Sequence, residues 1–472
     1  MIARRRGLIE IGGVPGGLGC LLVVFAYLDC QQALYFLNFL QNPWLQPVLV
    51  TATLAIVTGY FLAPSDQARV LALAGLVLLF FVVPQVLAIL GRPSHYPVHD
   101  GILLTDAASG RLLGGLDPYG HDYIDSIGRQ FLMPEVPVNF GLGHYVYMPI
   151  MILLGVPFHL TGIDQVWLWP IGAALLAWAA YDLGDTPQRA RAALIGLGLN
   201  PLMLLDGYAY LNDLFPLAMI LAAFGQMRRR RPVWAGVIFG LALATKQHAV
   251  LFAPLLIAYA WPDRRVAWRS VTAAVATTIV IALPFLAWNP GGFIADTAAF
   301  FYGKGVDSYP IRGLSVPGLL LRDHLISNRW AAFAATVPLQ VAGVALVLGL
   351  WVRYGFRSGA AGWLWTGAFI LAVFEPSRVL APNYLDLGLI ALFLGLALGL
   401  EDFPPALATI GGLIEKALGH SRVEATAPGE QAGHFLAAQA GQPVSGIKAS
   451  SGGENWWVRG QHSPDPQSQL SG

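Results

Sequence analysis

The sequence predicts an all-α membrane protein, a polytopic bundle of transmembrane helices. Of its 472 residues, 56% are hydrophobic and only 12% are charged, whereas charged residues make up about 25% of a soluble domain. The charges fall in clusters between apolar runs, and the longer runs reach the roughly 20 residues that a helix needs to cross a bilayer. The net charge of +1 gives no reason to expect a nucleic-acid partner.

The apolar runs and the arginine clusters together predict the topology. Loops rich in arginine stay in the cytoplasm, so the arginines at 4–6 and 228–231 are expected on that side. The smaller arginine clusters also fall on the cytoplasmic side, but only if segment 146–162 does not cross the membrane. The apolar segments are 14–40, 47–63, 70–91, 146–162, 164–182, 190–206, 213–227, 232–246, 248–261, 269–289, 331–352, 360–375 and 379–400.

Segment 146–162 is therefore predicted to be a re-entrant or in-plane helix at the outer interface. Pro149 and Pro157 interrupt it, and it follows tyrosines, whose rings settle at membrane interfaces. The remaining segments give about twelve spans. Both the N-terminus and the C-terminal tail of this multi-pass protein are then cytoplasmic, and the membrane is expected to be the plasma membrane.

The chain divides by composition into 1–69, with N-terminal spans, the main membrane domain 70–400, and 401–472. In the last part an amphipathic helix is expected, followed by a disordered cytoplasmic tail rich in Gly, Ser, Gln and Pro. Loops 91–145 and 290–330 both face outward in this topology. Loop 91–145 gathers Asp100, Asp106, Asp117, Asp122, Asp125 and Glu135, together with His95, His99, His121 and His144.

Asp100 is the first candidate catalytic residue. It opens an expected short helix that ends near Leu113, where Asp is a common N-cap. Alternatively, a carboxylate shielded by the loop and the membrane can have its pKa raised enough to act as a general base. Asp106 follows about a turn and a half later and is the second candidate. The sequence leaves these alternatives open.

Further polar residues stand at breaks between the apolar segments. Lys246 and His248 flank one break, where lysine either snorkels to the interface or binds a ligand. Arg312 and Arg378 are expected on the outer face, where an arginine pairs with local acids or holds a phosphate. Asn212 and Asp213 precede another segment and either cap it or bind a ligand. Tyr119 and His144 of the first outer loop complete the candidate acceptor- or sugar-binding residues.

The sequence shows no motif that is typical of other catalytic chemistries. The sequence contains no Gly-rich phosphate loop, no Cys-x-x-Cys pair and no His-Glu-x-x-His. His95 and His99 have a spacing that suits a metal on a helix, but Pro97 lies between them and disfavours that helix. We therefore expect neither a cofactor nor a bound metal.

A series of short motifs resembles the GT-C superfamily of glycosyltransferases, over residues 70–400. Within that superfamily the chain looks most like the bacterial mannosyltransferases that use polyprenyl-phosphate mannose, including those that extend phosphatidylinositol mannosides. The order of the motifs carries the resemblance more than any one of them. They are Asp100, Gly114-Gly-Leu-Asp-Pro-Tyr119, Tyr145-Val-Tyr-Met-Pro149, Leu199-Asn-Pro201, Asn212-Asp213-Leu-Phe-Pro216, Arg228-Arg-Arg-Arg-Pro232 and Gly240-Leu-Ala-Leu-Ala-Thr-Lys246.

The resemblance implies a membrane enzyme with an outward-facing active site and a catalytic Asp in its first outer loop, which Asp100 matches. Asp213 matches a second acid on the next outer turn. The chain departs from the family pattern because two apolar segments, 14–40 and 47–63, precede that loop. This departure puts the register of the loop in doubt, and it keeps Asp106 as an alternative base.

The expected function is transfer of a hexose, mannose by the resemblance, from a polyprenyl-phosphate donor to a hydroxyl of a glycolipid or glycan acceptor. The transfer would invert the anomeric carbon, and Lys246, Arg312 and Arg378 would stabilise the leaving phosphate. A flippase for lipid-linked sugars, or another transporter, is the rival function. A transporter would place its ionisable residues at the bilayer midplane on broken helices. An acyltransferase would need a histidine in the middle of a span.

Overall fold

The computed structural model describes residues 2–5, 8–11, 14–91, 99–123, 143–302, 308–311, 315–327, 337–354, 359–377 and 382–402. It confirms the predicted all-α bundle of apolar helices. A small antiparallel sheet was not predicted and precedes the first helix, with strands β1 (Ile2–Arg5), β2 (Leu8–Ile11) and β3 (Val14–Pro15). The expected amphipathic helix and tail after residue 402 lie outside the described residues.

Six helices of the described chain are long and apolar enough to cross a membrane. They are α1 (Gly16–Leu37), α2 (Leu45–Leu62), the continuous run Asp66–Gly91, the run Gln165–Leu183, α14 (Arg264–Trp288) and α20 (Pro382–Asp402). Within these runs lie α3 (Asp66–Val77), the π-helix η2 (Leu78–Val82), α4 (Val83–Gly91), the 3-10 helix η4 (Gln165–Trp167) and α8 (Leu168–Leu183).

Shorter helices complete the bundle. They are α9 (Pro187–Ala193), the π-helix η5 (Leu194–Gly198), α10 (Pro201–Tyr208), α11 (Leu214–Arg228), α12 (Pro232–Leu243), the 3-10 helix η6 (Gln247–Phe252), α13 (Ala253–Ala260), α18 (Val337–Tyr354) and α19 (Gly359–Phe374). The polar connections carry α5 (Asp100–Leu113), α7 (Pro149–Thr161), α15 (Pro290–Ile294), the π-helix η7 (Ala295–Ala299), α16 (Phe300–Tyr302) and α17 (Val316–Arg322).

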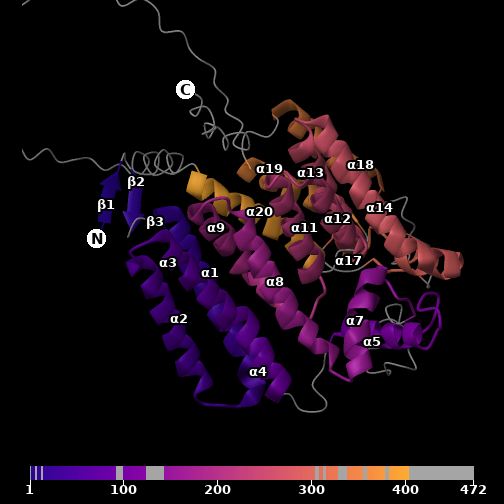
Figure 1. Ribbon diagram of the computed structural model, residues 1–472, viewed down its shortest axis with the longest axis horizontal. Helices are drawn as coiled ribbons and strands as arrows, with labels where there is room; N and C mark the ends of the chain where they lie inside the picture. The colour runs from indigo at the N-terminus through magenta and orange to yellow at the C-terminus, as the bar shows by residue number, and fades with distance from the viewer. Residues whose placement is uncertain are drawn as a thin grey trace, which may run out of the picture.

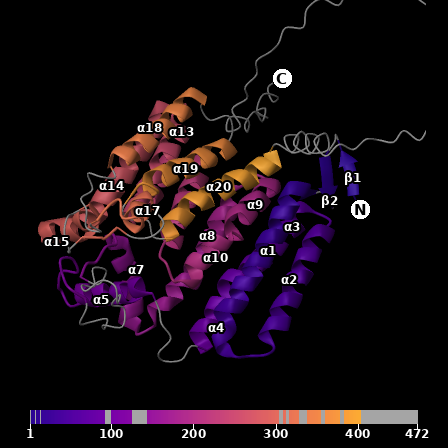
Figure 2. The same cartoon turned by 180° about the vertical axis from the view of Figure 1, so that it is seen from behind.

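The helices form one continuous slab. Helices α1 to α4 lie at one side of it, α8 to α11 lie in the middle, and α12, α14, α18 and α19 lie at the other side (Figure 1; Figure 2 shows the back). Helix α12 packs closely on α14 because Gly236 and Gly240 face the backbone of α14, where a Cβ atom would collide with the Ser270 and Ala274 carbonyls. Small residues allow such close approach between membrane helices.

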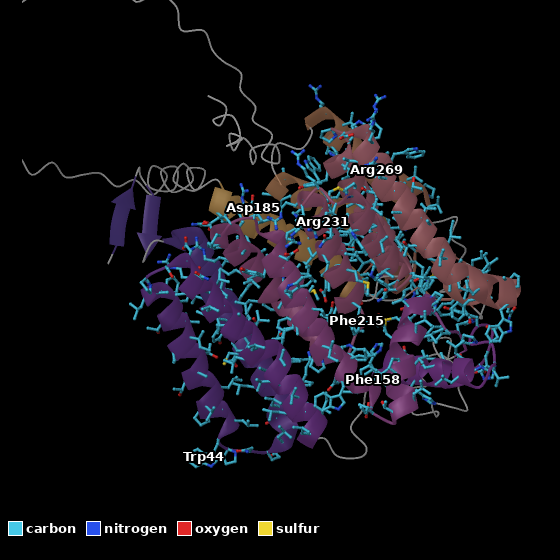
Figure 3. All side chains as sticks on the ribbon, in the orientation of Figure 1. Trp44, Phe158, Asp185, Phe215, Arg231 and Arg269 are labelled. Atoms are coloured by element: carbon cyan, nitrogen blue, oxygen red, sulfur yellow. The ribbon has the colours of Figure 1, made fainter. Side chains whose placement is uncertain are left out.

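The two ends of the bundle differ in their polar residues. Asp185, Arg231 and Arg269 lie at one end, which we call the arginine end, and Trp44 and Phe158 lie at the opposite end, which we call the loop end (Figure 3). Helices α5 and α7 lie at the loop end (Figure 1). The positive-inside rule assigns the arginine end to the cytoplasm, and this orientation stays a prediction.

Helix α7 corresponds to the segment that was predicted not to cross. Its thirteen residues span about 20 Å at 1.5 Å per residue, which is less than the bilayer core of about 30 Å. It begins where α12 ends, because the Ile150 N–H donates to the Ala244 carbonyl at 2.9 Å. Helix α7 then packs on α5 at the loop end. Helix α12 is as short as α7 and is counted as a span, so the non-crossing assignment of α7 stays a prediction.

A buried charge network joins α3, α9 and α20. Arg191, whose side chain is 2% exposed, lies 2.6 Å from an oxygen of Asp66 and 2.9 Å from an oxygen of Glu401. Asp66 also pairs with Arg69 at 2.8 Å. Removing one partner of a buried ion pair leaves an uncompensated charge, which costs about 3–5 kcal/mol.

Arg191→Ala is therefore expected to destabilise the fold by several kcal/mol. The matched control is Arg189→Ala on the same helix, because Arg189 pairs with the partly exposed Asp185 at 3.0 Å and such surface pairs contribute about 0–1 kcal/mol. Thermal unfolding of the two detergent-solubilised variants measures the difference. Equal losses at the two positions would contradict the assigned role of Arg191.

Candidate functional site

A buried ion cluster lies where two breaks between helices meet. Asp213 is the last residue of the turn between α10 and α11, Lys246 ends the break between α12 and η6, and His248 lies in the first turn of η6. The Lys246 Nζ donates to both carboxylate oxygens of Asp213 at 2.8 Å each, and the His248 Nε2 lies 3.0 Å from Asp213 Oδ1. The three side chains are at most 7% exposed. The structure therefore brings these predicted residues into one contact.

The Asp213 carboxyl stays ionised in this cluster. Burial alone would raise its pKa, but Lys246 and then His248 outweigh burial and hold the pKa well below its ordinary value. A carboxylate held in this way does not accept a proton near neutral pH. Asp213 is therefore suited to fixing Lys246 and His248 in place, and it is a poor general base.

Other groups surround the cluster. The Lys246 Nζ lies 5.4 Å from the centre of the Tyr384 ring, and the His248 ring contacts the same tyrosine edge-on at 5.6 Å. Asp206 of α10 and Asp386 of α20 lie within electrostatic reach of Asp213. The sequence analysis did not single out Asp386 or Tyr384. Their only local signal is a polar residue near the start of a long apolar helix.

Asp100 is not the N-cap of its helix. The cap is His99, whose Nδ1 accepts the Gly101 N–H at 3.0 Å. Asp100 is the first residue of α5, its side chain is 36% exposed, and its Oδ1 lies 3.0 Å from the same His99 nitrogen. The capping interpretation of Asp100 is therefore wrong, and its carboxylate remains accessible.

Tyr147 connects Asp100 with the buried ion cluster. Its hydroxyl packs against Gly101, where a Cβ atom would come within 2.5 Å of the phenol oxygen. Burial raises the pKa of Tyr147 well above its ordinary value, and the nearby negative charges of Asp100 and Asp213 raise it further. One buried side chain thus lies within electrostatic reach of both acids, so the start of α5 and the ion cluster occupy the same region of the loop end.

Asp106 makes a different set of contacts. Its Oδ1 lies 2.9 Å from the His159 Nδ1 and accepts a hydrogen bond from the Gln165 side chain at 3.0 Å. His159 belongs to the last turns of α7, about 15 Å along the helix from Pro149. Asp106 therefore ties α5 to the far end of α7 and to η4.

Asp296 of η7 is a second buried acid, which the sequence analysis did not identify. Its Oδ2 accepts the Gly120 N–H at 2.7 Å and the Tyr145 N–H at 3.3 Å, and its Oδ1 lies 2.7 Å from the His144 Nδ1. The Gln247 side chain donates to the carbonyls of Val146 and Thr297. These bonds hold the segment that leads into Tyr147. A lone acid in an apolar stretch was the signal that could have revealed Asp296.

The remaining candidates have varied surroundings. The Tyr119 hydroxyl donates to the Tyr147 carbonyl at 3.0 Å, and its ring is buried among aromatic side chains, so it supports the loop from inside. Asn212 is 5% exposed, and its amide nitrogen has no partner within the described part of the chain. Arg312 and Arg378 lie outside the described residues. In the ranges that the structure describes, no group of three or more His, Cys, Asp or Glu side chains is arranged to hold a metal ion.

A polar centre at one end of an apolar helical bundle defines a membrane enzyme, and comparison with known families identifies its class as glycosyltransferase. The family model described as glycosyltransferase family 87 matches residues 145–382, which is half of the 472-residue chain. The protein belongs to glycosyltransferase family 87. No curated protein and no solved structure matches it. The matched range contains Asp213, Lys246 and His248 and begins after Asp100.

Replacing Lys246 by Met should reverse the pH dependence of stability. In the wild type the lowered pKa of Asp213 means that its contribution is present above the unfolded value of about 3.9 and is lost only as the pH falls below it. Without Lys246, burial dominates and raises the pKa. The ionised carboxylate then destabilises the fold at high pH, and this cost disappears as the pH falls.

We therefore expect the unfolding temperature of Lys246→Met to increase from pH 8 to pH 5, while that of the wild type stays level or decreases. Lys246→Arg keeps the charge and serves as the control. A Lys246→Met, Asp213→Asn double variant should lose the reversed dependence. Parallel pH profiles for wild type and Lys246→Met would show that the pair does not set the charge state of Asp213.

Removing Asp296 should misplace the loop around Tyr147. Asp296→Ala leaves two backbone N–H groups and His144 without their acceptor, so we expect sugar transfer to fall at least about tenfold, because small misplacements of catalytic groups are costly. Asp296→Asn keeps one carbonyl acceptor and should fall less. Asp122→Asn changes an exposed acid of the same loop and should leave transfer unchanged. The measurement is the initial rate of sugar transfer, compared at equal amounts of folded protein. Wild-type rates for Asp296→Ala would contradict this positioning role.

Proposed function

We propose that this glycosyltransferase moves a hexose, expected to be mannose, from a polyprenyl-phosphate donor to a hydroxyl of a glycolipid or glycan at the outer face of the plasma membrane. The observation that carries the proposal is the convergence of Asp100 and the Asp213–Lys246–His248 cluster around Tyr147. It supports a centre in which an accessible acid faces a buried cationic group at the membrane boundary.

Asp100 is the proposed general base. It removes the proton from the acceptor hydroxyl, and the acceptor oxygen then forms a bond to the anomeric carbon of the donor. The bond from that carbon to the phosphate oxygen breaks, and the lipid phosphate leaves with the electron pair. Attack from the face opposite to the phosphate inverts the anomeric carbon. His99 lies beside Asp100 at 3.0 Å and would share the abstracted proton.

The leaving phosphate needs positive charge more than it needs a proton. Lys246 gives two of its hydrogen bonds to Asp213 and retains a third N–H. Asp206 lies within electrostatic reach of the same lysine, Asp386 lies within reach of Asp213, and each opposes a further anion when it is ionised. We therefore assign Lys246 and His248 to orienting the phosphate, and Arg312 and Arg378 to neutralising it. Asn212 and Asp213 would bind sugar hydroxyls, as would His144 at the edge of the loop.

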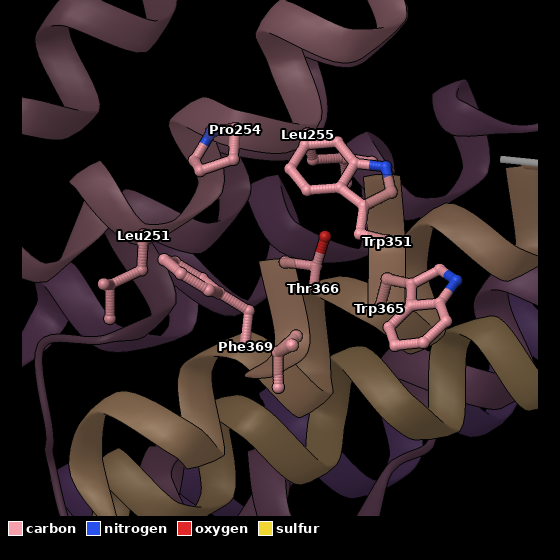
Figure 4. Close-up of a pocket in the computed structure, with 8 residues that line it drawn as sticks. Leu251, Pro254, Leu255, Trp351, Trp365, Thr366 and Phe369 are labelled. Atoms are coloured by element: carbon pink, nitrogen blue, oxygen red, sulfur yellow. The ribbon is translucent and has the colours of Figure 1, made fainter. Parts of the chain in front are cut away.

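A small apolar groove lies on the η6–α13 segment that follows the ion cluster, and its lining would suit part of a hydrocarbon chain. It lies between η6 and α13 on one side and α18 and α19 on the other (Figure 4). Leu251 lines it and lies about 6 Å along the 3-10 helix from His248. The Thr366 hydroxyl is bound to the Gly362 carbonyl of its own helix at 2.8 Å. The groove is lined by Leu251, Pro254, Leu255, Val347, Trp351, Trp365, Thr366 and Phe369.

Membership of a glycosyltransferase family favours this function over the rival, a flippase for lipid-linked sugars. A nucleotide sugar would need a water-filled site for its base and diphosphate. A lipid-linked donor needs a polar site for its head and an apolar site for its hydrocarbon chain, and the ion cluster and the apolar groove are the residues proposed for these two sites.

The test compares Asp100→Asn with Asp106→Asn on the same helix. Asn keeps the shape of Asp but cannot accept the proton, so Asp100→Asn should lower transfer from polyprenyl-phosphate mannose by about 100-fold or more. Asp106→Asn removes charge from a contact between helices and should cost little activity. Unfolding temperature and monodispersity confirm that both variants fold. Loss of activity in Asp106→Asn alone would move the base to Asp106, and full activity in both variants would reject a base on α5.

A further inference from the structure

A second group of buried polar side chains lies within the membrane bundle, away from the proposed catalytic site. Asp29 stands inside α1 and Gln85 inside α4, and both side chains are fully buried. Neither carboxylate oxygen of Asp29 and neither amide atom of Gln85 has a hydrogen-bond partner in the described part of the chain. The Oε1 of Gln32, about one turn from Asp29 on the same face of α1, is likewise buried without a partner.

These residues lie on neighbouring helices. Asp29 is about 12 Å along α1 from Leu37, and Gln85 is about 9 Å along α4 from Gly91. Gly91 packs against Leu40, three residues beyond the end of α1. Helices α1 and α4 pack on each other (Figure 1), and α1 also packs on α10.

The last turn of α10 links the two polar helices. Tyr208 lies within electrostatic reach of Asp29, and the Gln85 amide lies 3.0 Å from the position that a Cβ atom on Gly207 would take. The Tyr208 hydroxyl donates to the Phe80 carbonyl at 2.5 Å, so it does not satisfy Asp29. Asp29 and Gln85 thus border the same turn without bonding to each other.

Unpaired polar atoms at this density are unusual. More than 90% of buried polar groups in native proteins are hydrogen-bonded, and an ionised carboxylate in a low-dielectric interior costs several kcal/mol unless a positive charge compensates it. The described part of the chain places no cationic side chain near Asp29. A bound cation would satisfy these oxygen atoms and would balance the charge of an ionised Asp29.

We propose that Asp29, Gln32 and Gln85 bind one monovalent metal cation, sodium or potassium, between α1, α4 and α10. Carboxylate and amide oxygens are the donors that hard cations prefer. A single carboxylate balances a single positive charge, and the described residues hold no cluster of three or more acidic, His or Cys side chains that a divalent ion would favour.

The cation would also fix the last turn of α10. That turn carries Gly207 and Tyr208 beside the cation site and Asp206 beside Asp213. Binding would therefore stabilise the hairpin that presents Asp213 to Lys246. The proposal does not depend on the identity of the sugar donor, because its test is the stability of the protein.

The test is thermal unfolding of the full-length, detergent-solubilised protein in choline chloride, with choline replaced by sodium, potassium or lithium at constant ionic strength. A ligand that binds only the folded state raises the unfolding temperature in a saturable way. For the wild type we expect such a rise of a few degrees with sodium or potassium, and the more effective ion identifies the ligand. Asp29→Asn should show no response, while Asp122→Asn should respond as the wild type does.

Gln85→Leu provides a second variant in case Asp29→Asn fails to fold. It removes one oxygen ligand and should raise the half-saturating cation concentration at least about tenfold. Binding of radioactive sodium or rubidium to the same samples gives a readout that is independent of stability. A wild type without a cation-specific response, or variants at Asp29 and Gln85 that respond as the wild type does, would overturn the proposal.

Discussion

The ion pair between Lys246 and Asp213 is the interaction on which the polar end of this protein depends. Each partner is nearly buried, and either charge alone would cost several kcal/mol in that environment. The pair joins the break after α12 to the turn before α11, so it fixes two interrupted helices against each other. Interrupted helices expose backbone groups, and a membrane tolerates them only where the protein satisfies those groups.

Contacts on both sides of this break hold the elements of the loop end by their backbone. Ala244 and Gln247, on either side of Lys246, bind the main chain of Ile150 and Val146. Asp296 accepts the N–H of Tyr145, which precedes them in the same segment. The start of α5 therefore takes its place through Tyr147 and its neighbours. Precise placement of this kind is what an active site built on rigid elements requires.

Much of the fold and part of the site follow from sequence. Hydrophobic runs predict the spans because membrane immersion is a local property of a segment. The same pattern predicts 146–162 as an exception, through its prolines and the arginine clusters. Lys246, His248 and Asp213 stood out because each is an ionisable residue at a break, although their pairing across 33 positions has no local signal.

The rest could not be predicted because it depends on long-range contacts. Asp296 is one acid in an apolar stretch, and nothing near it in the chain shows that Gly120 and Tyr145 are its donors. The N-cap was one of two interpretations of Asp100, because Asp caps helices more often than His. In the fold, the His99 ring accepts the Gly101 N–H instead. The short sheet before α1 consists of a few residues of mixed polarity. Such a short sequence pattern cannot be distinguished from that of a loop.

The buried and partly buried acids of the bundle differ in how their charge is compensated. Asp213 has Lys246, Asp66 has two arginines, Asp182 has Arg229, and Asp296 has two backbone N–H groups and a histidine. Each of these acids is compensated from within the chain, as an apolar environment demands. Asp29 lies as deep as any of them, yet both its oxygens lack a partner in the described part of the chain. The other four acids are compensated within the chain, and the proposed cation is the partner that would compensate Asp29 in the same way.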